Sequence, residues 1–385
     1  MQFNFTCPLE TFSIKIAIIG GCEIAKQLTI IAQNLSIETH IITNNKFSPA
    51  GQVAHVEHVI NLMDTLSLKT TIEDINPTVL IVQNYNFDFD ILLELKDRGI
   101  SIFPNYDSLK FSLNRENISM LFENNPLFNE LDHEFIYSLD QLHEAINLVG
   151  LPCIIKPLNR RAKFKPIFVD KKMDFKNLIE NKYTINNGLL IQKIVDFDME
   201  ISLVGVRFKS FTNNLTSEHY ECSEIKFSPP ISKYIDSNEF ICSWQQSCIS
   251  EVALTRCKKI ALQIINYLNS YGIYNFNFFI KDDNVYLNKV NPFIDHTGFL
   301  TIHTQNISQF EIFIRTVLEL PISKIQLKIG GVARPILSDS HGIITVPKKN
   351  FMVDNTFFYI FGKRYDDDDM KGMIIHTELD IVDKF

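Results

Sequence analysis

The chain has 385 residues, of which 45% are hydrophobic and 21% are charged, proportions typical of a globular protein with two or three domains. Its net charge of -8 gives no reason to expect nucleic acid or an anionic membrane as a partner. No apolar run approaches the roughly 18 residues of a membrane-spanning helix, and residues 1–12 lack the pattern of a signal peptide. The seven cysteines form no C-x-x-C pair, so we expect free thiols in a cytoplasmic protein.

The first hundred or so residues alternate between strand and helix patterns, which predicts a doubly wound parallel sheet. We expect strands at Ser13–Gly20, Glu38–Thr43, Val79–Val82 and Ile100–Phe103, and helices at Glu23–Leu35 and Asp88–Arg98. The turn Gly20-Gly21-Cys22 lacks the later glycines of a dinucleotide-binding fingerprint, so it does not predict an NAD site.

The pattern changes to mixed α+β after Asn114. Short apolar strands are expected at Pro152–Lys156 and Leu189–Ile194. An amphipathic helix is predicted to begin after Ser250 as N-cap and to end at Gly272. A hairpin should follow, with strands Ile273–Lys281 and Val285–Val290 joined by Asp282-Asp283-Asn284.

Tyr271–Gly298, which contains this hairpin, resembles the ATP-grasp enzymes, in particular formate-dependent phosphoribosylglycinamide formyltransferase of the folate-independent type. Val53–Asp64, Ser112–Ile118 and Phe197–Ile201 resemble further motifs of that family. The resemblance covers about residues 14 to 382 and implies an ATP-grasp fold and, as in the family, a homodimer. It implies a Rossmann-like N-terminal domain (1–113), an ATP-grasp domain (114–321) and a β-rich C-terminal domain (322–385).

The resemblance also implies a nucleotide site. Lys156 ends its strand where the family contacts the nucleotide phosphates. The positions of Gln192, Lys193 and Val195 belong to the hinge that binds adenine through its backbone, and Glu200 falls where the ribose hydroxyls are held. A lysine at a strand end and an acid at a strand start are also common solvent-facing features, so both interpretations stay open.

In the family a flap of small residues, S-S-S-G-K-G-Q, covers the phosphates. Here the flap contains Arg160, Arg161, Lys163 and Lys165 and ends in Pro166, so its backbone cannot cradle phosphate in the family's manner. The basic side chains could attract an anion by charge, or they could form a solvated loop.

Five positions match the family's substrate site: Glu23, Asn84, Arg115, His296 and Lys363. Gln83-Asn84-Tyr85-Asn86 replaces the family's P-E-x-E, so a cationic amine would lose its counter-charge.

Two further features have ordinary interpretations. His55 and His58 are expected to be loop or strand features rather than ligands. The acidic run Asp366–Asp369 replaces the arginine pair that follows the family's F-G-K, so it would repel a phosphate or form a solvated turn.

The two glutamates that hold magnesium in the family are replaced by Asn277 and Lys289. Magnesium prefers carboxylate oxygen, and a lysine ammonium repels it, so no metal ligand is predicted. We therefore hypothesise a non-catalytic member of the family that binds a protein partner or a nucleotide such as ATP without magnesium. The alternatives are an active enzyme that forms formyl-glycinamide ribonucleotide from formate and ATP, and an ATP-dependent ligase with a changed substrate and substitute ligands such as Asp283 or Asp295.

Overall fold

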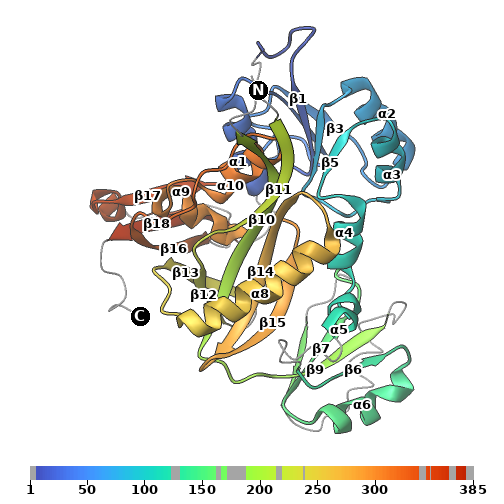
Figure 1. Ribbon diagram of the computed structural model, residues 1–385, viewed down its shortest axis with the longest axis vertical. Helices are drawn as coiled ribbons and strands as arrows, with labels where there is room; N and C mark the ends of the chain where they lie inside the picture. Colours follow the sequence, from blue (N-terminus) through green and yellow to red (C-terminus); the bar gives the residue numbers. More distant parts are fainter. Residues whose placement is uncertain are drawn as a thin grey trace.

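The parallel sheet predicted for the N-terminal region is present in the computed structural model (blue to cyan in Figure 1). Its strands, in spatial order, are β3 (Val56–Val59), β2 (Glu38–Thr43), β1 (Lys15–Ile19), β4 (Val79–Val82) and β5 (Ser101–Phe103). The structure describes residues 6–122, 131–161, 166–170, 188–213, 219–236, 239–337, 344–346, 348–363 and 370–378.

Both faces of this sheet are covered, which explains the uninterrupted apolar run of β1. Ile16 and Ile18 pack into a core shared with α1 (Glu23–Asn34) and α10 (Gln309–Val317). Ala17 and Ile19 face the opposite core, which includes residues of α2 (Thr65–Ile75) and α3 (Ile91–Asp97).

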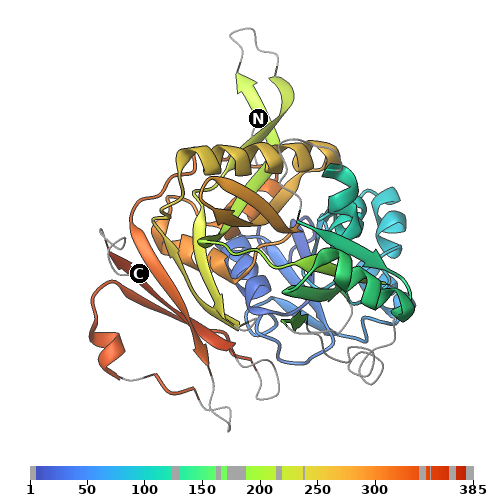
Figure 2. The same cartoon turned by 90° about the horizontal axis from the view of Figure 1, so that it is seen from below.

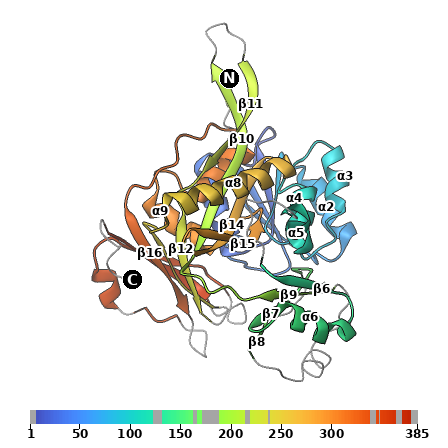
Figure 3. The same ribbon diagram turned by 60° about the horizontal axis from the view of Figure 1, so that its bottom comes forward.

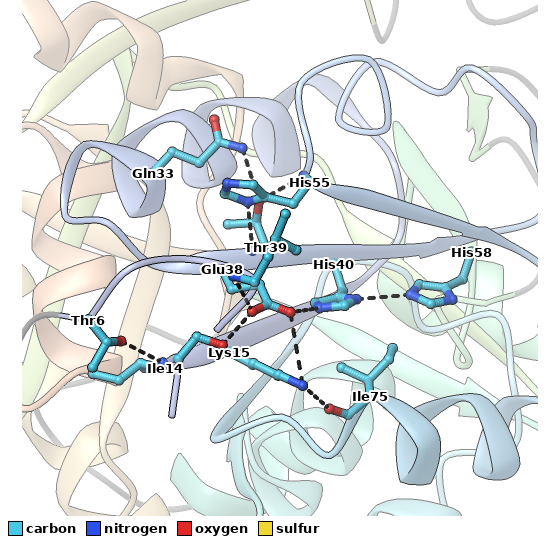
Figure 4. A network of polar contacts seen from close by, with 12 residues as sticks. Thr6, Ile14, Lys15, Gln33, Glu38, Thr39, His40, His55, His58 and Ile75 are labelled. Atoms are coloured by element: carbon cyan, nitrogen blue, oxygen red, sulfur yellow. Dashed lines mark hydrogen bonds and ion pairs between the residues drawn. The ribbon is translucent and has the colours of Figure 1, made fainter. Parts of the chain in front are cut away.

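A buried polar network crosses from β2 to β3 (Figure 4). Glu38 Oε1 lies 2.7 Å from His40 Nε2, and His40 Nδ1 lies 3.0 Å from His58 Nε2. His55 Nδ1 accepts a hydrogen bond of 3.1 Å from the Thr39 backbone N–H. His55 and His58 thus make hydrogen bonds with residues of β2, which agrees with their interpretation as loop or strand features.

A second, antiparallel sheet forms the lower right of Figure 1. Its order is β6 (His133–Ile136), β9 (Leu189–Lys193), β7 (Cys153–Pro157) and β8 (Ile167–Val169). The helices α4 (Tyr106–Leu113) and α5 (Glu116–Phe122) lead into it from the N-terminal sheet, and α6 (Leu142–Val149) packs on it after the 3-10 turn η1 (Leu139–Gln141).

The third sheet has nine strands within the described residues and contains the predicted hairpin. Its main path is β15 (Asn284–Asn291), β14 (Gly272–Lys281), β10 (Met199–Asn213), β12 (Ile231–Asp236), β13 (Glu239–Gln245), β16 (Gly330–Leu337), β18 (Met370–Glu378) and β17 (Thr356–Ile360). The ninth strand, β11 (His219–Phe227), pairs with β10 in a ribbon that projects from the body (Figures 2 and 3).

Helix α8 (Glu251–Leu268) lies across β10, β14 and β15 and buries its apolar face on them (Figure 1). The predicted N-cap is confirmed, because Ser250 Oγ accepts from the Ala253 backbone N–H at 3.1 Å. The predicted end at Gly272 is wrong. Asn269, in the left-handed conformation, closes the helix, and Gly272 is already the first residue of β14.

In the C-terminal region β16 pairs with β13, β18 with β16 and β17 with β18, so these strands extend the same sheet as the hairpin. The remaining short helices are η2 (His296–Leu300), α9 (Thr301–Thr304) and η3 (Lys348–Met352). The domain boundaries at 113 and 321 stay predictions. All seven cysteines lie in the described part as free thiols, and no helix described there is long and apolar enough to cross a membrane.

Candidate functional site

A cavity of about 520 Å³ opens at the carboxyl ends of the parallel strands. The turns after β1, β2 and β4 line it, and ligands of doubly wound sheets commonly bind at this edge. Gly20 has a φ of 110°, and a Cβ on Gly21 would lie 2.2 Å from Ser48 Oγ, so both positions require glycine. Arg160, Arg161 and Lys363 line the cavity from the side of the other two sheets.

Three of the predicted substrate residues meet at this cavity. Glu23, at the start of α1, is ion-paired through Oε1 with His296 Nε2 and through Oε2 with Lys363 Nζ, the latter at 3.2 Å. Burial alone would raise the pKa of Glu23, but the hydrogen bond from His296 and the charges of His296 and Lys363 outweigh burial and lower the pKa to about 2. Glu23 is therefore an ionised carboxylate whose two oxygens already have cationic partners.

Of the other two predicted substrate residues, one lies at the same cavity and the other does not. Asn84 lines the same cavity, and its Oδ1 accepts a hydrogen bond of 2.8 Å from the Asn86 backbone N–H. Arg115 instead borders a second, smaller space, where its Nε donates to the Pro157 carbonyl at 2.9 Å. Burial lowers the pKa of Arg115 to about 10.

The second space, of about 40 Å³, is a narrow cleft between the β6–β9 sheet and β15. Both Lys156 on β7 and Gln192 on β9 line it from the sheet, and Lys156 Nζ donates to Gln192 Oε1 at 2.9 Å. Burial, together with the charges of Arg115 and Arg160, lowers the pKa of Lys156 to about 7, although Glu200 acts in the opposite direction. The structure thus brings Lys156 and Gln192 together at this cleft, and their role in nucleotide binding stays a prediction.

The other two hinge residues do not line this cleft among the described residues. Lys193 Nζ donates to the Leu151 carbonyl at 3.3 Å, and Val195 is a half-buried residue after the end of β9. The prediction that the backbone of these residues binds adenine stays a prediction.

Arg160 borders both the cavity and the cleft. Burial and the charge of Arg115 lower its pKa to about 9, and its Nε and Nη1 are buried without a hydrogen-bond partner in the described part. The Arg161 guanidinium carbon lies 4.1 Å from the centroid of the Phe89 ring. Arg161 lines the cavity but not the cleft. Lys163 and Lys165, and the acidic run Asp366–Asp369, lie outside the described residues.

The ribose-site prediction meets a residue that sequence reasoning missed. Glu200 on β10 and Lys233 on β12 are cross-strand partners, and their buried side chains form an ion pair at 2.9 Å. The carboxylate of Glu200 therefore has a cationic partner before any ligand arrives. The available signal was a lysine flanked by Ile231, Tyr234 and Ile235 in a short strand pattern, but its partner depends on strand register.

Comparison with known proteins agrees with this geometry. The ATP-grasp domain model matches residues 128–310. Formate-dependent phosphoribosylglycinamide formyltransferase of Methanococcus vannielii is 30% identical over 336 residues, which cover 86% of this chain and 83% of the relative. The chain belongs to this family. The enzyme of the same name from Prochlorococcus marinus (strain MIT 9312) is 29% identical over 91% of this chain and 88% of the relative.

Solved structures share the ATP-grasp fold. The ADP complex of N5-carboxyaminoimidazole ribonucleotide synthetase has a TM-score of 0.83 at 20% identity and covers 99% of this chain and 95% of its own. The structure titled glycinamide-RNase-transformylase T, from Mycobacterium tuberculosis, has a TM-score of 0.76 at 20% identity, with 95% of both chains covered. At this identity the likeness concerns the fold alone.

The hairpin that would hold magnesium in this formyltransferase family does not fit the ion. Asn277 on β14 is the cross-strand partner of Lys289 on β15. Burial, followed by the charge of Arg160, lowers the pKa of Lys289 to about 8, while Asp295 acts in the opposite direction. The described residues contain no group of three or more His, Cys, Asp or Glu side chains that could hold a metal. An ammonium group beside an amide repels a divalent cation that needs carboxylates.

Proposed function

We propose that this protein binds a nucleotide such as ATP in the cleft bordered by Lys156, Gln192 and Arg160, with fixed cationic side chains in place of magnesium, and that it does not transfer a phosphoryl group. The observation that carries the proposal is the position of Lys289 opposite Asn277 on the hairpin. Phosphoryl transfer depends on metal ions that neutralise the developing charge, and these two residues offer no carboxylate to hold them.

The electrostatics of the cleft favour an anion. Arg115 and Arg160 both lower the pKa of Lys156, and Arg160, Lys233 and Arg115 all lower that of Lys289. The mutual repulsion of these cations is therefore larger than the attraction that Glu200 and Asp295 exert on Lys156 and Lys289. A polyphosphate among them would relieve the repulsion and form charge-assisted hydrogen bonds with the arginines and lysines.

The cleft must widen to admit a nucleotide. Only about 40 Å³ is open, and the Lys156 ammonium is held by Gln192 of the neighbouring strand. We infer that Lys156 and Arg160 turn toward the phosphates when the ligand enters. The loss of a neutral acceptor such as Gln192 costs Lys156 less than an ionic phosphate partner contributes.

Calorimetric titration with ATP tests this proposal, once with EDTA and once with excess magnesium. We expect binding at least as tight in EDTA as in magnesium, because the side chains compete with the metal for the same phosphate oxygens. Lys289→Met should weaken binding in EDTA, whereas Lys259→Met, on the exposed face of α8, should not. Binding that requires magnesium, or no binding in either condition, would overturn the proposal.

The comparisons support a second candidate more directly than the first. Relatives named formate-dependent phosphoribosylglycinamide formyltransferase match this chain over most of their length, which favours an active ATP-dependent formyltransferase or a related ligase. Its test is phosphate release from ATP with formate and glycinamide ribonucleotide. Magnesium-dependent release that Lys156→Ala abolishes would establish this candidate and remove the non-catalytic one.

A homodimer is also proposed, on the resemblance to the family alone. Light scattering at several protein concentrations tests it. A mass of a single chain, 44.5 kDa, at all concentrations would contradict it.

A further inference from the structure

We propose that the 520 Å³ cavity takes a small ligand that presents an acidic group, a carboxylate or a phosphate, toward Arg160 and Arg161. A ligand with an amine at this place would be rejected. The inference concerns the cavity of the parallel sheet; Arg160 borders the nucleotide cleft as well, whereas Arg161 does not.

The donors at the cavity are in excess. Among the described residues, Arg160 has two buried guanidinium nitrogens without hydrogen-bond partners, Nε and Nη1, and Arg161 has two, Nε and Nη2. The amide nitrogen of Gln83, at the end of β4, is also buried without a partner. Buried donors without partners each cost free energy, so a ligand that supplies acceptor oxygens is favoured.

Three side chains at the cavity have acceptor oxygens that are already engaged. Both oxygens of Glu23 are ion-paired, with His296 and Lys363, although Oε2 accepts no hydrogen bond among the described residues. Asn84 Oδ1 accepts from the Asn86 backbone N–H at 2.8 Å, and Asn44 Oδ1 accepts from the Leu62 backbone N–H at 2.8 Å. An ammonium group in this cavity would have to compete with these partners for oxygen atoms.

The charges lead to the same result. Four basic side chains line the cavity, Lys46, Arg160, Arg161 and Lys363, against the single carboxylate of Glu23. Burial lowers the pKa of Arg161, while the charges of Asp88 and Asp90 act in the opposite direction, and neither acid lines the cavity. A ligand with an acidic group would be attracted, and an amine would be repelled.

The position of Arg161 makes it suited to bind an acid. Its guanidinium plane is held over the ring of Phe89, which limits the rotamers it can sample. A guanidinium fixed in this way loses little entropy when it pairs with a carboxylate or phosphate. Because Arg161 does not border the cleft, its substitution separates ligand binding in the cavity from nucleotide binding.

Four commercially available sugar derivatives test the proposal by calorimetry. 6-Phosphogluconate carries a carboxylate and a phosphate, sorbitol 6-phosphate carries only the phosphate, gluconate carries only the carboxylate, and glucosamine 6-phosphate carries a phosphate and an ammonium group. We expect 6-phosphogluconate to bind about tenfold or more tightly than glucosamine 6-phosphate, the scale of one charge-assisted hydrogen bond. The two singly functionalised sugars show whether the carboxylate or the phosphate carries the preference.

Variants assign the preference to the arginine. Arg161→Gln should lower the preference for 6-phosphogluconate over glucosamine 6-phosphate to about threefold or less, as expected when a charge is removed. Arg161→Lys keeps the charge and should retain most of the preference, and it also serves if the Gln variant does not fold. The matched control is Arg98→Gln, at the C-cap of α3, which lies outside the cavity and should leave the preference unchanged.

Three results would overturn the proposal. They are equal or tighter binding of glucosamine 6-phosphate, an unchanged preference in Arg161→Gln, and no binding of any of the four sugars at millimolar concentration. ATP binding in EDTA is measured on the same samples. Loss of ATP binding with an intact acid preference would overturn the nucleotide proposal alone.

Discussion

Lys289→Met tests the electrostatic reasoning about the hairpin most directly. The pKa of Lys289 falls from 10.5 to about 8, first because of burial and then because of Arg160, Lys233 and Arg115. A displacement of this size corresponds to at most about 3 kcal/mol of destabilisation from the charged form. Below pH 8 the lysine is charged in both the folded and the unfolded chain, so the full cost is present at pH 7. It is relieved as the pH rises from about 8 to 10.5.

Methionine preserves most of the side-chain volume of lysine and removes the charge. One contact is lost, because the Asn291 side-chain amide, with its oxygen toward Lys289 Nζ, accepts a hydrogen bond of 3.1 Å. That loss offsets about 1 kcal/mol. We therefore expect Lys289→Met to raise the free energy of unfolding by about 2 kcal/mol at pH 7.

The assay is urea denaturation at pH 7, followed by circular dichroism. Lys259→Met, on the exposed face of α8, is the matched control and should change the free energy of unfolding by less than about 0.5 kcal/mol. A Lys289→Met protein that is less stable than the wild type by more than about 1 kcal/mol would refute the reasoning. Such a result would mean that an acidic partner such as Asp295 stabilises the Lys289 ammonium more than burial and the neighbouring cations destabilise it.

Three further substitutions test the buried pairs of Glu23 and Glu200 and the N-cap of α8. Glu23→Gln should cost about 3 kcal/mol at pH 7, because the pKa of Glu23 lies at about 2 instead of 4.5. That contribution is complete above pH 4.5 and is lost as the pH falls towards 2. The free energies of unfolding of variant and wild type, measured by urea titration, should therefore converge near pH 2. A difference that does not change with pH would contradict the ion pair. Glu200→Gln should cost about 3 kcal/mol, since it leaves Lys233 buried without its carboxylate, and an unchanged denaturation midpoint would show that the pair contributes nothing. Ser250→Ala should cost about 1 kcal/mol through loss of the α8 N-cap, measured by thermal unfolding. Ser323→Ala, at an exposed position outside the helices, is the control and should change little.

The sequence was informative wherever a local pattern decides the structure. The apolar run of β1, the turn residues of the hairpin and the N-cap of α8 each depend on neighbours within a few positions. The end of α8 shows the limit of this reasoning. A glycine is the most common residue after a helix, but Asn269 reaches the left-handed conformation first and ends the helix three residues earlier.

The site was less predictable because its chemistry depends on partners far apart in the chain. Lys233 was not singled out, since only the register of β12 against β10 places it opposite Glu200. Glu23 in the first helix pairs with Lys363 in the segment after β17. The resemblance placed both residues at one site but did not predict that they form an ion pair with each other. The same resemblance grouped Arg115 with them, whereas the fold places it beside Lys156 in the cleft.

The two acids retained at family positions already have partners within this chain. Glu23 and Glu200 both match positions that would contact a ligand, yet each is neutralised by a lysine of this chain, Lys363 or Lys233. A carboxylate with a buried ammonium partner stabilises the fold and is not available to a ligand hydroxyl or amine without breaking that pair. Arg160, whose Nε and Nη1 have no hydrogen-bond partner among the described residues, borders both spaces. The cavity and the cleft therefore share one buried guanidinium, and both proposals expect an anion beside it.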